Sequence, residues 1–447
     1  MSANYILNNP AWLGEIPSHW DCKKMGSLFT ERKVKVSDKE YPPLSVAKIG
    51  VVPQLDTAVK TDAGDNRKLV RIGDFVINSR SDRKGSCGVS EHDGSVSLIN
   101  IVLTPRNLWN SRYVHYLLRS HPFSEEYYRN GRGIVADLWT TRYSEMKSIL
   151  LPIPPRSEQD QIVRFLDWKV STVNRLISIK KKLIQDYEEA KKKIVVSLVV
   201  KGLDDSVPMK DSGSKWLGTI PANWRCLRAK YLFREVDDRS LIGKEELLTV
   251  SHISGITPRS AKNVTMFKSE SLIGYKICKP GRIAANTMWM WQGAIAVSNY
   301  DGVISPSYNT YEQISDGYIP EYLDFLLRAK PLVDNYVVLS SGIRKSRLRL
   351  YPEQFLTILF PVPPIEDQRR IVDAIRERIA KIQDIISVRQ QEISVLQEFK
   401  ARLIADVVTG KIDVRSIQIP EYEFAEENID TENDESMEGM ESETYEE

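Results

Sequence analysis

The feature that most constrains this 447-residue chain is a long helical pattern that occurs twice, 209 residues apart. The first copy follows Pro154-Pro155 and the second follows Pro363-Pro364, where the missing proline N–H costs little at the start of a helix. Apolar residues then recur at spacings of four and three, which is the heptad pattern of a coiled-coil seam. The predicted seam residues are Leu166, Val170, Val173, Ile177, Ile184, Tyr187, Ile194 and Leu198 in the first copy, and Ile375, Ile379, Ile382, Ile386, Ile393, Leu396, Leu403 and Val407 in the second.

Each of these segments is long enough to act as a spacer. A helix from Ile162 to Leu198 measures about 55 Å at 1.5 Å per residue, which exceeds a typical globular helix. Two amphipathic helices, each packed on its own domain, are one interpretation; two helices that face each other are the other. The polar interruptions also match, Lys180 with Arg389 and Lys191 with Lys400, and this matched register favours helices that face each other.

The duplication extends through the rest of the chain. Trp12–Trp20 matches Trp216–Trp224 at an offset of 204, and Leu117–Arg119 matches Leu326–Arg328 at an offset of 209. The chain is therefore a tandem repeat in which a globular part of about 140 residues, a normal domain size, precedes each long helix. The predicted segments are a first domain at 1–153, a first spacer helix at 154–204, a second domain at 205–362, a second spacer helix at 363–413, and an acidic, disordered tail at 414–447.

Each globular part shows a mixed pattern. Phe75–Asn78 and Ile295–Val297 are short β-prone runs bounded by glycine, whereas Tyr113–Ser120 and Tyr322–Ala329 have helical spacing ended by proline. We therefore predict an α+β fold: two tandem domains, mostly sheet with one or two packed helices, joined by two long helices in an antiparallel coiled coil. The tail is predicted to be disordered because residues 421–447 hold 13 Asp and Glu and few large apolar residues.

Two similar units with self-complementary helices imply an internal pseudo-two-fold axis. An antiparallel pair would place one globular domain at each end of the rod. The Trp-Leu-Gly segment of each copy would then lie near the C-terminal end of the other copy's helix. The two ends would be separated by about one turn of DNA or more, roughly 34 Å.

The charge of the chain is uneven. Without the acidic tail, 62 Lys and Arg face 47 Asp and Glu, an excess of about +15. An excess of this size favours a polyanionic partner, although a basic protein without such a partner has the same composition. The hydrophobic content of 42% and charged content of 27% are typical of a soluble globular protein.

Several classes of protein are disfavoured. The four cysteines form no C-x-x-C pair and the five histidines are scattered, so we expect neither a zinc site nor a disulfide framework. We expect a reducing cytoplasm, because the sequence shows no apolar run of membrane-spanning length and no secretory signal pattern.

Four motifs, taken in order, resemble those of the specificity subunit of a Type I restriction-modification system. They are W-L-G-x-I-P-x-x-W twice, the stretch Ile295–Tyr308, the P-x-P-P-x-x-[DE]-Q-x-x-I-V openings of both helices, and the endings VVKGLD and VTGKID. The resemblance covers nearly the whole chain except the acidic tail.

That family implies a function and a set of partners. Each target-recognition domain would read one half of a bipartite site in double-stranded DNA, and the antiparallel helices would set the spacing. The helices would also help to recruit two modification (methyltransferase) subunits, to which restriction (endonuclease and translocase) subunits add. The subunit itself would have no catalytic activity.

Residues that diverge between shared flanks are candidates for reading sequence. Between matched Asn and Gly residues, the first copy reads SRSDRK and the second reads TMWMWQ. Arg and Lys can donate to guanine, and Gln can pair with adenine; the two tryptophans of the second copy are equally compatible with packing. In a strand, Lys345, Arg347 and Arg349 would share one face and form a basic row. A third variable loop precedes Gly50 and Gly255. The predicted DNA-binding residues are Lys48, Arg80, Arg83, Lys84, Arg142, His252, Trp289, Trp291, Arg344, Lys345, Arg347 and Arg349.

Catalytic motifs are missing from the sequence. It has no Walker-type G-x-x-x-x-G-K-[ST] and no [DNS]-P-P-[FYW] tetrapeptide of an adenine methyltransferase. We therefore expect no cofactor on this chain, with S-adenosylmethionine, ATP and magnesium on the partner subunits. A self-contained nuclease or methyltransferase, and a coiled-coil scaffold without base-specific DNA binding, are the competing interpretations.

Overall fold

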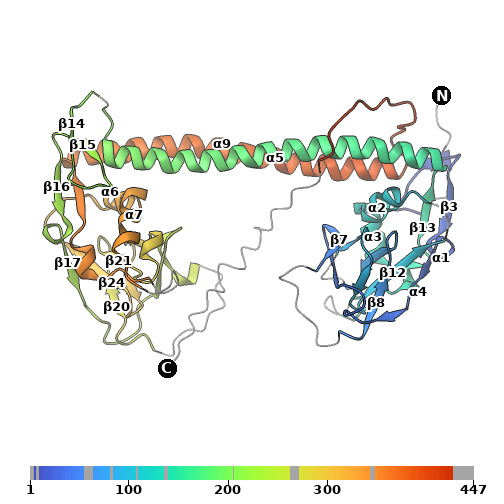
Figure 1. The fold of residues 1–447 in the computed structure, drawn as a ribbon, viewed down its shortest axis with the longest axis horizontal. Helices are drawn as coiled ribbons and strands as arrows, with labels where there is room; N and C mark the ends of the chain where they lie inside the picture. Colours follow the sequence, from blue (N-terminus) through green and yellow to red (C-terminus); the bar gives the residue numbers. More distant parts are fainter. Residues whose placement is uncertain are drawn as a thin grey trace. The chain divides into compact units, whose positions relative to one another are not determined.

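The computed structural model describes residues 5–6, 10–54, 64–80, 84–106, 109–134, 139–204, 206–261, 271–342 and 348–425. The chain divides into two compact units. The first combines Met1–Lys181 with Gln390–Asp430, and the second combines Lys182–Arg389 with Thr431–Glu447. Each long helix thus contributes one half to each unit (Figure 1).

The described part of the first unit is built from short strands and short helices. The strands are β1 (Tyr5–Ile6), β2 (Ile16–Pro17), β3 (Asp21–Lys24), β4 (Phe29–Glu31), β5 (Lys35–Val36), β6 (Leu44–Ala47), β7 (Gly50–Pro53), β8 (Arg67–Val70), β9 (Phe75–Asn78), β10 (Cys87–Val89), β11 (Gly94–Val96), β12 (Asn100–Pro105) and β13 (Leu150–Ile153). The helices are α1 (Met25–Leu28), α2 (Ser111–Arg119), α3 (His121–Arg129) and α4 (Tyr143–Met146).

The second unit repeats this order of elements. Its strands are β14 (Met209–Asp211), β15 (Thr219–Pro221), β16 (Arg225–Arg228), β17 (Phe233–Val236), β18 (Leu248–Ser251), β19 (Gly255–Pro258), β20 (Lys276–Cys278), β21 (Ile283–Ala285), β22 (Ile295–Val297), β23 (Gly302–Ile304), β24 (Asn309–Gln313) and β25 (Leu359–Val362). Its helices are η3 (Ala229–Tyr231), η4 (Arg259–Ala261), η5 (Met290–Gln292), α6 (Pro320–Leu327), α7 (Lys330–Leu339) and α8 (Pro352–Phe355).

The sheet topology of the two units corresponds closely, except that the place of β5 beside β8 is taken in the second unit by a single bridge between Arg239 and Lys276. The largest sheet has the order β10-β9-β12-β4 in the first unit and β22-β21-β24-β17 in the second. Every residue of β9 and of β21 is buried, which explains their continuous apolar runs in the sequence. The predictions of an α+β fold and of two tandem domains are confirmed.

The long helices are α5 (Arg156–Lys201) and α9 (Ile365–Val408). Each begins just after its Pro-Pro pair and stops before a glycine, Gly202 or Gly410, at φ of +81° and +77°. Glycine adopts such positive φ values without steric cost, so it ends a helix readily. The helices are therefore a few residues shorter at each end than the predicted spans.

The two helices run antiparallel within each unit. In the first unit, Lys400 Nζ donates to Asn174 Oδ1 at 3.2 Å and Lys180 Nζ donates to Glu392 at 2.7 Å. The residue number on α9 therefore decreases as the residue number on α5 increases. In the second unit, Lys191 Nζ donates to Gln383 at 3.0 Å. The bond between Lys191 and Gln383 is equivalent to the bond between Lys400 and Asn174, because the residues correspond at the repeat offset of 209.

The seam positions take the place that the heptads predict. All sixteen are buried or half-buried, and Leu166 and Val407 in the first unit and Ile375 and Ile386 in the second are at most 1% exposed. Three of the four polar interruptions make the cross-helix bonds above. Their ammonium groups are thus hydrogen-bonded within an otherwise apolar seam.

A buried glutamine lies in the first turn of each long helix and holds the proline segment that precedes it. Gln159 Nε2 donates to the carbonyl of Pro154, and Gln368 Nε2 donates to the carbonyl of Pro363, both at 3.0 Å. These buried glutamines are the Gln that both helix openings share, so that part of the motif is structural.

The C-terminal end of the other copy's helix also enters each core. A Cβ added at Gly410, just past α9, would lie 2.4 Å from Pro17 and 3.0 Å from Trp20. A Cβ added at Gly202, just past α5, would lie 3.2 Å from Trp224. The prediction that each Trp-Leu-Gly segment lies near the end of the other copy's helix is confirmed.

The prediction of a disordered tail from residue 414 onward is wrong for residues 414–425. Val414 is 2% exposed in the core of the first unit. Gln161 on α5 donates to the carbonyls of Val414 and Ile417 at 3.0 and 2.8 Å, and Asn174 donates to the carbonyl of Ala425 at 3.2 Å. We call residues 414–425 the strap. Residues 426–447 lie outside the described residues.

Candidate nucleic-acid interface

The variable loops of the first domain gather at one end of its sheets. Strand β9 leads into Arg80, which bridges to Thr140, and the N–H of Thr141 donates to the carbonyl of Ser79 at 3.0 Å. This contact places Arg142 close to Arg80. Both arginine side chains are exposed.

Lys48 lies at the same end. The chain reverses between β8 and β9, so the start of β8 lies at the same end of the domain as the end of β9. A hydrogen bond agrees with this: Lys68, near the start of β8, donates to the carbonyl of Asn100, which pairs with Asn78 at the end of β9. Strand β11 runs toward Lys68, and β6 lies parallel to β11 through a bridge between Pro43 and Ser95. The β6–β7 turn that carries Lys48 therefore points to the end that carries Arg80. We call this the reading end of the domain.

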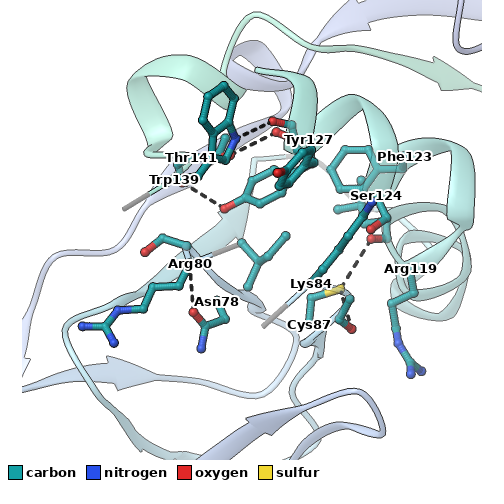
Figure 2. A pocket seen from close by; sticks show the side chains of 15 residues that line it. Asn78, Arg80, Lys84, Cys87, Arg119, Phe123, Ser124, Tyr127, Trp139 and Thr141 are labelled. Atoms are coloured by element: carbon teal, nitrogen blue, oxygen red, sulfur yellow. Dashed lines mark hydrogen bonds between the residues drawn. The ribbon is translucent and has the colours of Figure 1, made fainter. Parts of the chain in front are cut away.

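An aromatic pocket lies beneath this reading end (Figure 2). Its lining includes Phe123 and Tyr127 of α3 and Trp139. The Tyr127 hydroxyl donates to the carbonyl of Thr141 at 2.9 Å, and Trp139 Nε1 donates to the carbonyl of Tyr128 at 2.9 Å. Figure 2 shows the Arg80 side chain extending away from these rings. The pocket thus fixes the 139–142 segment, and the basic group faces outward.

Lys84 is partly neutralised by its neighbours. Its ammonium lies 2.5 Å from Glu125 Oε1 and 4.9 Å from the centroid of the Tyr128 ring. The hydrogen bond from Lys84 is the main cause that lowers the pKa of Glu125, so the carboxylate stays charged at neutral pH. A phosphate contact by Lys84 would have to compete with this pair.

A residue that the sequence did not single out supports the Lys48 turn. The guanidinium of Arg119 donates to the carbonyl of Lys48 and contacts His115 at 2.6 Å. Burial, together with the charges of Arg119 and Arg112, lowers the pKa of His115 to about 3, so the imidazole is neutral near pH 7. The Leu-Leu-Arg that recurs at 117–119 and 326–328 is the sequence signal that could have pointed to Arg119.

The cysteine of this region is not a reactive one. Burial raises the pKa of Cys87 to about 12, so its thiol stays protonated at neutral pH. Among the described residues, no group of three or more His, Cys, Asp or Glu could hold a metal ion.

The second domain has the same kind of reading end. Strand β21 leads into Asn286 and the loop that carries Trp289 and Trp291. The N–H of Leu350 approaches the carbonyl of Thr287 at 3.4 Å, which brings the exposed Arg349 to this loop.

His252 lies at this end as well. Strand β18 is parallel to β23 through the bridge between Leu247 and Val303, and β23 runs antiparallel to β20 toward Lys276. The chain reverses between β20 and β21, so Lys276 at the start of β20 lies at the same end of the domain as Asn286, just past β21. The β18–β19 turn, which carries the exposed His252, therefore points to that end.

The two tryptophans of the second domain pack against each other. Their ring centroids are 6.0 Å apart at an interplanar angle of 22°, and Trp291 Nε1 donates to the carbonyl of Met288 at 2.8 Å. Met290 between them is 1% exposed. The packing interpretation therefore accounts for much of this run, and only the half-buried ring faces are left to meet DNA.

Four of the predicted DNA-binding residues are not placed. Arg83, Arg344, Lys345 and Arg347 lie outside the described residues. The structure brings Lys48, Arg80, Lys84 and Arg142 to the reading end of the first domain, and His252, Trp289, Trp291 and Arg349 to that of the second. For all twelve, DNA contact stays a prediction.

The long helices carry a second surface, which we call the apolar flank. Its seven side chains are each 37–64% exposed, and each immediately precedes a seam residue or one of the polar interruptions of the seam. Residues that share this offset from the seam lie on one side of a helix. The first unit contributes Leu176, Ile179, Val395 and Phe399, and the second unit contributes Leu183, Ile385 and Val388. Exposed apolar side chains that gather on one side of a helix are typical of interaction sites.

In the part of the chain that the structure describes, no helix is long and apolar enough to cross a membrane.

No protein-family profile matches the chain, but curated relatives do. The chain is 21% identical over 446 residues to the type I restriction enzyme MjaX specificity subunit of Methanocaldococcus jannaschii, covering 90% of this chain and 96% of that protein. It is 23% identical over 286 residues to the type I restriction enzyme MjaVIII specificity subunit of the same organism, covering 61% of this chain and 64% of that protein. These relatives confirm the family resemblance found in the sequence.

A solved structure shares the fold. It comes from a study described as "Structural basis underlying complex assembly and conformational transition of the type I R-M system". One of its chains matches 89% of this chain and 99% of its own length, with a TM-score of 0.59 and 13% sequence identity. The match shows a common architecture over almost the whole length of both chains.

Proposed function

We propose that this chain is the DNA sequence-specificity subunit of a Type I restriction-modification complex, in which each domain reads one half of a bipartite site. The full-length similarity to a curated specificity subunit carries this proposal. The structure supports it, because the loops that diverge between the two repeats gather at one end of each domain. A duplicated reader with a continuous helical pair suits a split DNA site.

Methylome sequencing of a host that expresses the complete system tests this function. We expect one methylated motif in two specific parts separated by a fixed number of unspecified base pairs. Exchanging residues 1–150 for those of a relative should change one part and leave the other part and the spacing unaltered. A continuous motif, or a change in both parts, would contradict the proposal.

We propose further that the chain is not itself an enzyme. Its sequence lacks the cofactor loop and tetrapeptide of an adenine methyltransferase. The purified chain, incubated with target DNA and S-adenosylmethionine, should transfer no methyl group, whereas the assembled complex should. Transfer by the chain alone would overturn this part of the proposal. S-adenosylmethionine, ATP and magnesium would bind to the partner subunits.

The apolar flank is the surface that we assign to the methyltransferase subunits. Ile385 and Val388 are 37% and 50% exposed and are one helical turn apart on α9. Replacing both with serine should weaken co-purification with the methyltransferase subunit, because the apolar area would no longer leave water on docking. Val338→Ser, at a site 62% exposed on α7, is the matched control. Unchanged co-purification of the double variant would remove the flank from this role.

The scaffold alternative makes a different prediction. A specificity subunit should give DNA binding by the complex that falls steeply with salt, because lysine and arginine side chains displace counterions from phosphates. A scaffold without a DNA function would give no such dependence. Comparing target and scrambled duplexes in the same titration separates sequence reading from simple charge attraction.

A further inference from the structure

Two loops at the reading end of the second domain have the same sequence and pack on each other. Residues 240–243 and 271–274 both read Ser-Leu-Ile-Gly. Ser240 is 1% exposed, and its N–H donates to the carbonyl of Tyr275 while its carbonyl accepts from the N–H of Gly274, both at 2.8 Å. The loops are therefore held together by backbone hydrogen bonds around a buried serine.

The turn between these bonds is tight. Gly243 has φ of +63° and its N–H donates to Ser240 Oγ at 2.8 Å. A Cβ at this position would lie 2.8 Å from the nitrogen of Ile273, so only glycine permits the close approach of the two loops. The Ser240 hydroxyl in turn donates to Glu245 at 2.6 Å. The pair of loops is a fixed platform.

This platform presents three large apolar side chains to solvent. Leu241, Ile242 and Ile273 are 87%, 64% and 62% exposed. We call them the apolar tip. Bulky apolar groups on a rigid surface loop contribute little to the core, so their cost to solubility points to a binding role. Basic residues, Arg239 and Lys244, flank the first loop in the sequence.

The sheet register places the apolar tip at the reading end. Strands β17 and β21 both pair antiparallel with β24 and thus run in the same direction; Val236 and Ala284 share the partner Thr310. The chain that continues past Val236 to the tip therefore heads the same way as the chain that continues past Ala285 to the tryptophan loop. The tip and that loop lie at one end of the domain.

The first domain has no such feature at the matching positions. Ser37, Asp38 and Asp65 stand in place of Leu241, Ile242 and Ile273. The Ser37 hydroxyl donates to Asp65 at 2.9 Å, and the Asp38 N–H donates to the carbonyl of Gly64 at 2.9 Å. The tip is thus a property of one reading end, as expected of an element that distinguishes two half-sites.

We propose that the apolar tip reads thymine in the half-site of the second domain by contacting its 5-methyl group in the major groove. This inference rests on the proposed function. The thymine methyl is the one apolar group that a base pair presents in that groove. A branched aliphatic tip with basic flanks suits it, since the cations hold neighbouring phosphates while the apolar side chains meet the methyl group.

The test compares duplexes that differ only in methyl groups. Exchanging the first domain and sequencing the methylome assigns the half-site of the second domain. Full-length chain, assembled with its methyltransferase subunit, is then titrated with the target duplex and with one in which uracil replaces every thymine of that half-site. We expect the wild type to bind the thymine duplex more tightly, by about fourfold for each buried methyl group.

The decisive variant replaces the tip. Leu241→Ser, Ile242→Ser and Ile273→Ser together should bind both duplexes equally and as weakly as the wild type binds uracil DNA. Ile314→Ser is the matched control, because it is 54% exposed just past Gln313, at the opposite end of β24. It should retain the full preference, and the melting temperatures of all three proteins should agree.

The outcomes separate the two proposals. A wild type that distinguishes target from scrambled DNA but not thymine from uracil overturns the role of the tip and leaves the proposed function standing. The role of the tip is also overturned if the tip variant keeps the preference for thymine, or if the half-site of the second domain contains no thymine. A complex that fails to distinguish target from scrambled DNA overturns both.

Discussion

Two neighbouring isoleucines on α9 allow a direct test of the seam. Ile386 is a seam position and is 1% exposed, whereas Ile385 belongs to the apolar flank and is 37% exposed. Replacing each in turn with alanine removes the same three carbon atoms and changes the helix propensity equally. The two variants therefore differ only in what surrounds the side chain.

The structure sets the expected magnitudes. At about 0.8 kcal/mol per buried carbon, plus a contribution from the cavity, Ile386→Ala should reduce the free energy of unfolding by about 3 kcal/mol. For a unit of about 200 residues, this corresponds to a melting temperature lower by roughly 6–12 °C. Ile385→Ala should cost less than about 1 kcal/mol.

Calorimetry of the full chain measures the shift, and native-state hydrogen exchange of the amides of α9 locates it. Faster exchange should centre on residues 375–389 in Ile386→Ala and should be absent from Ile385→Ala. Equal losses in the two variants, or no loss from Ile386→Ala, would refute the assignment of the heptad positions to the buried face.

Three further predictions concern the first unit. Gly410→Ala should destabilise the chain more than Gly218→Ala in urea titrations; both glycines have positive φ, but only at Gly410 would the Cβ meet a neighbour, at 2.4 Å. A hydrogen bond from Arg415 lowers the pKa of Asp413 from 3.8 to about 2. The stabilisation is therefore complete above about pH 4 and is lost as pH falls through 2, so the urea midpoints of wild type and Asp413→Asn should converge on acidification; a constant difference would contradict this. Deleting residues 414–447 should speed hydrogen exchange in the first half of α5 and leave the first half of α9 unaffected, and equal effects would refute the role of the strap.

The long helices could be predicted because their signals are local and repeated. The spacing of four and three, the Pro-Pro openings and the closing glycines are all read from neighbouring residues. Even the contact between Lys191 and Gln383 follows the same offset as that between Asn174 and Lys400. Because the pattern occurs twice, the helix predicted from one copy is supported by the matching residues of the other copy.

The reading ends could be predicted only in outline. Comparison of the repeats located the divergent loops, but their convergence depends on strand pairings between residues distant in the sequence, such as Asn78 with Asn100. The apolar tip could not be predicted, because leucine and isoleucine are usually buried and their residue type alone does not indicate an exposed position. Its exposure follows from the backbone bonds between the two loops.

The strap was missed for a related reason. Averaged over the acidic C-terminal region, the composition is that of a disordered segment, and three apolar residues, Val414, Ile417 and Ile419, do not alter that average. They pack because α5 offers a surface beside the core. Whether a short polar segment is ordered depends on the surface it meets, and local sequence does not encode that surface.

The division of the chain has a consequence for its synthesis on the ribosome. The second unit draws its described core from one continuous stretch, Lys182–Arg389, whereas the core of the first unit needs Val407, Val408 and Val414. Nascent domains fold as they emerge, from the N-terminus onward. Here the domain that is translated first would be completed last, and until then its unfinished core is a surface for chaperones to cover.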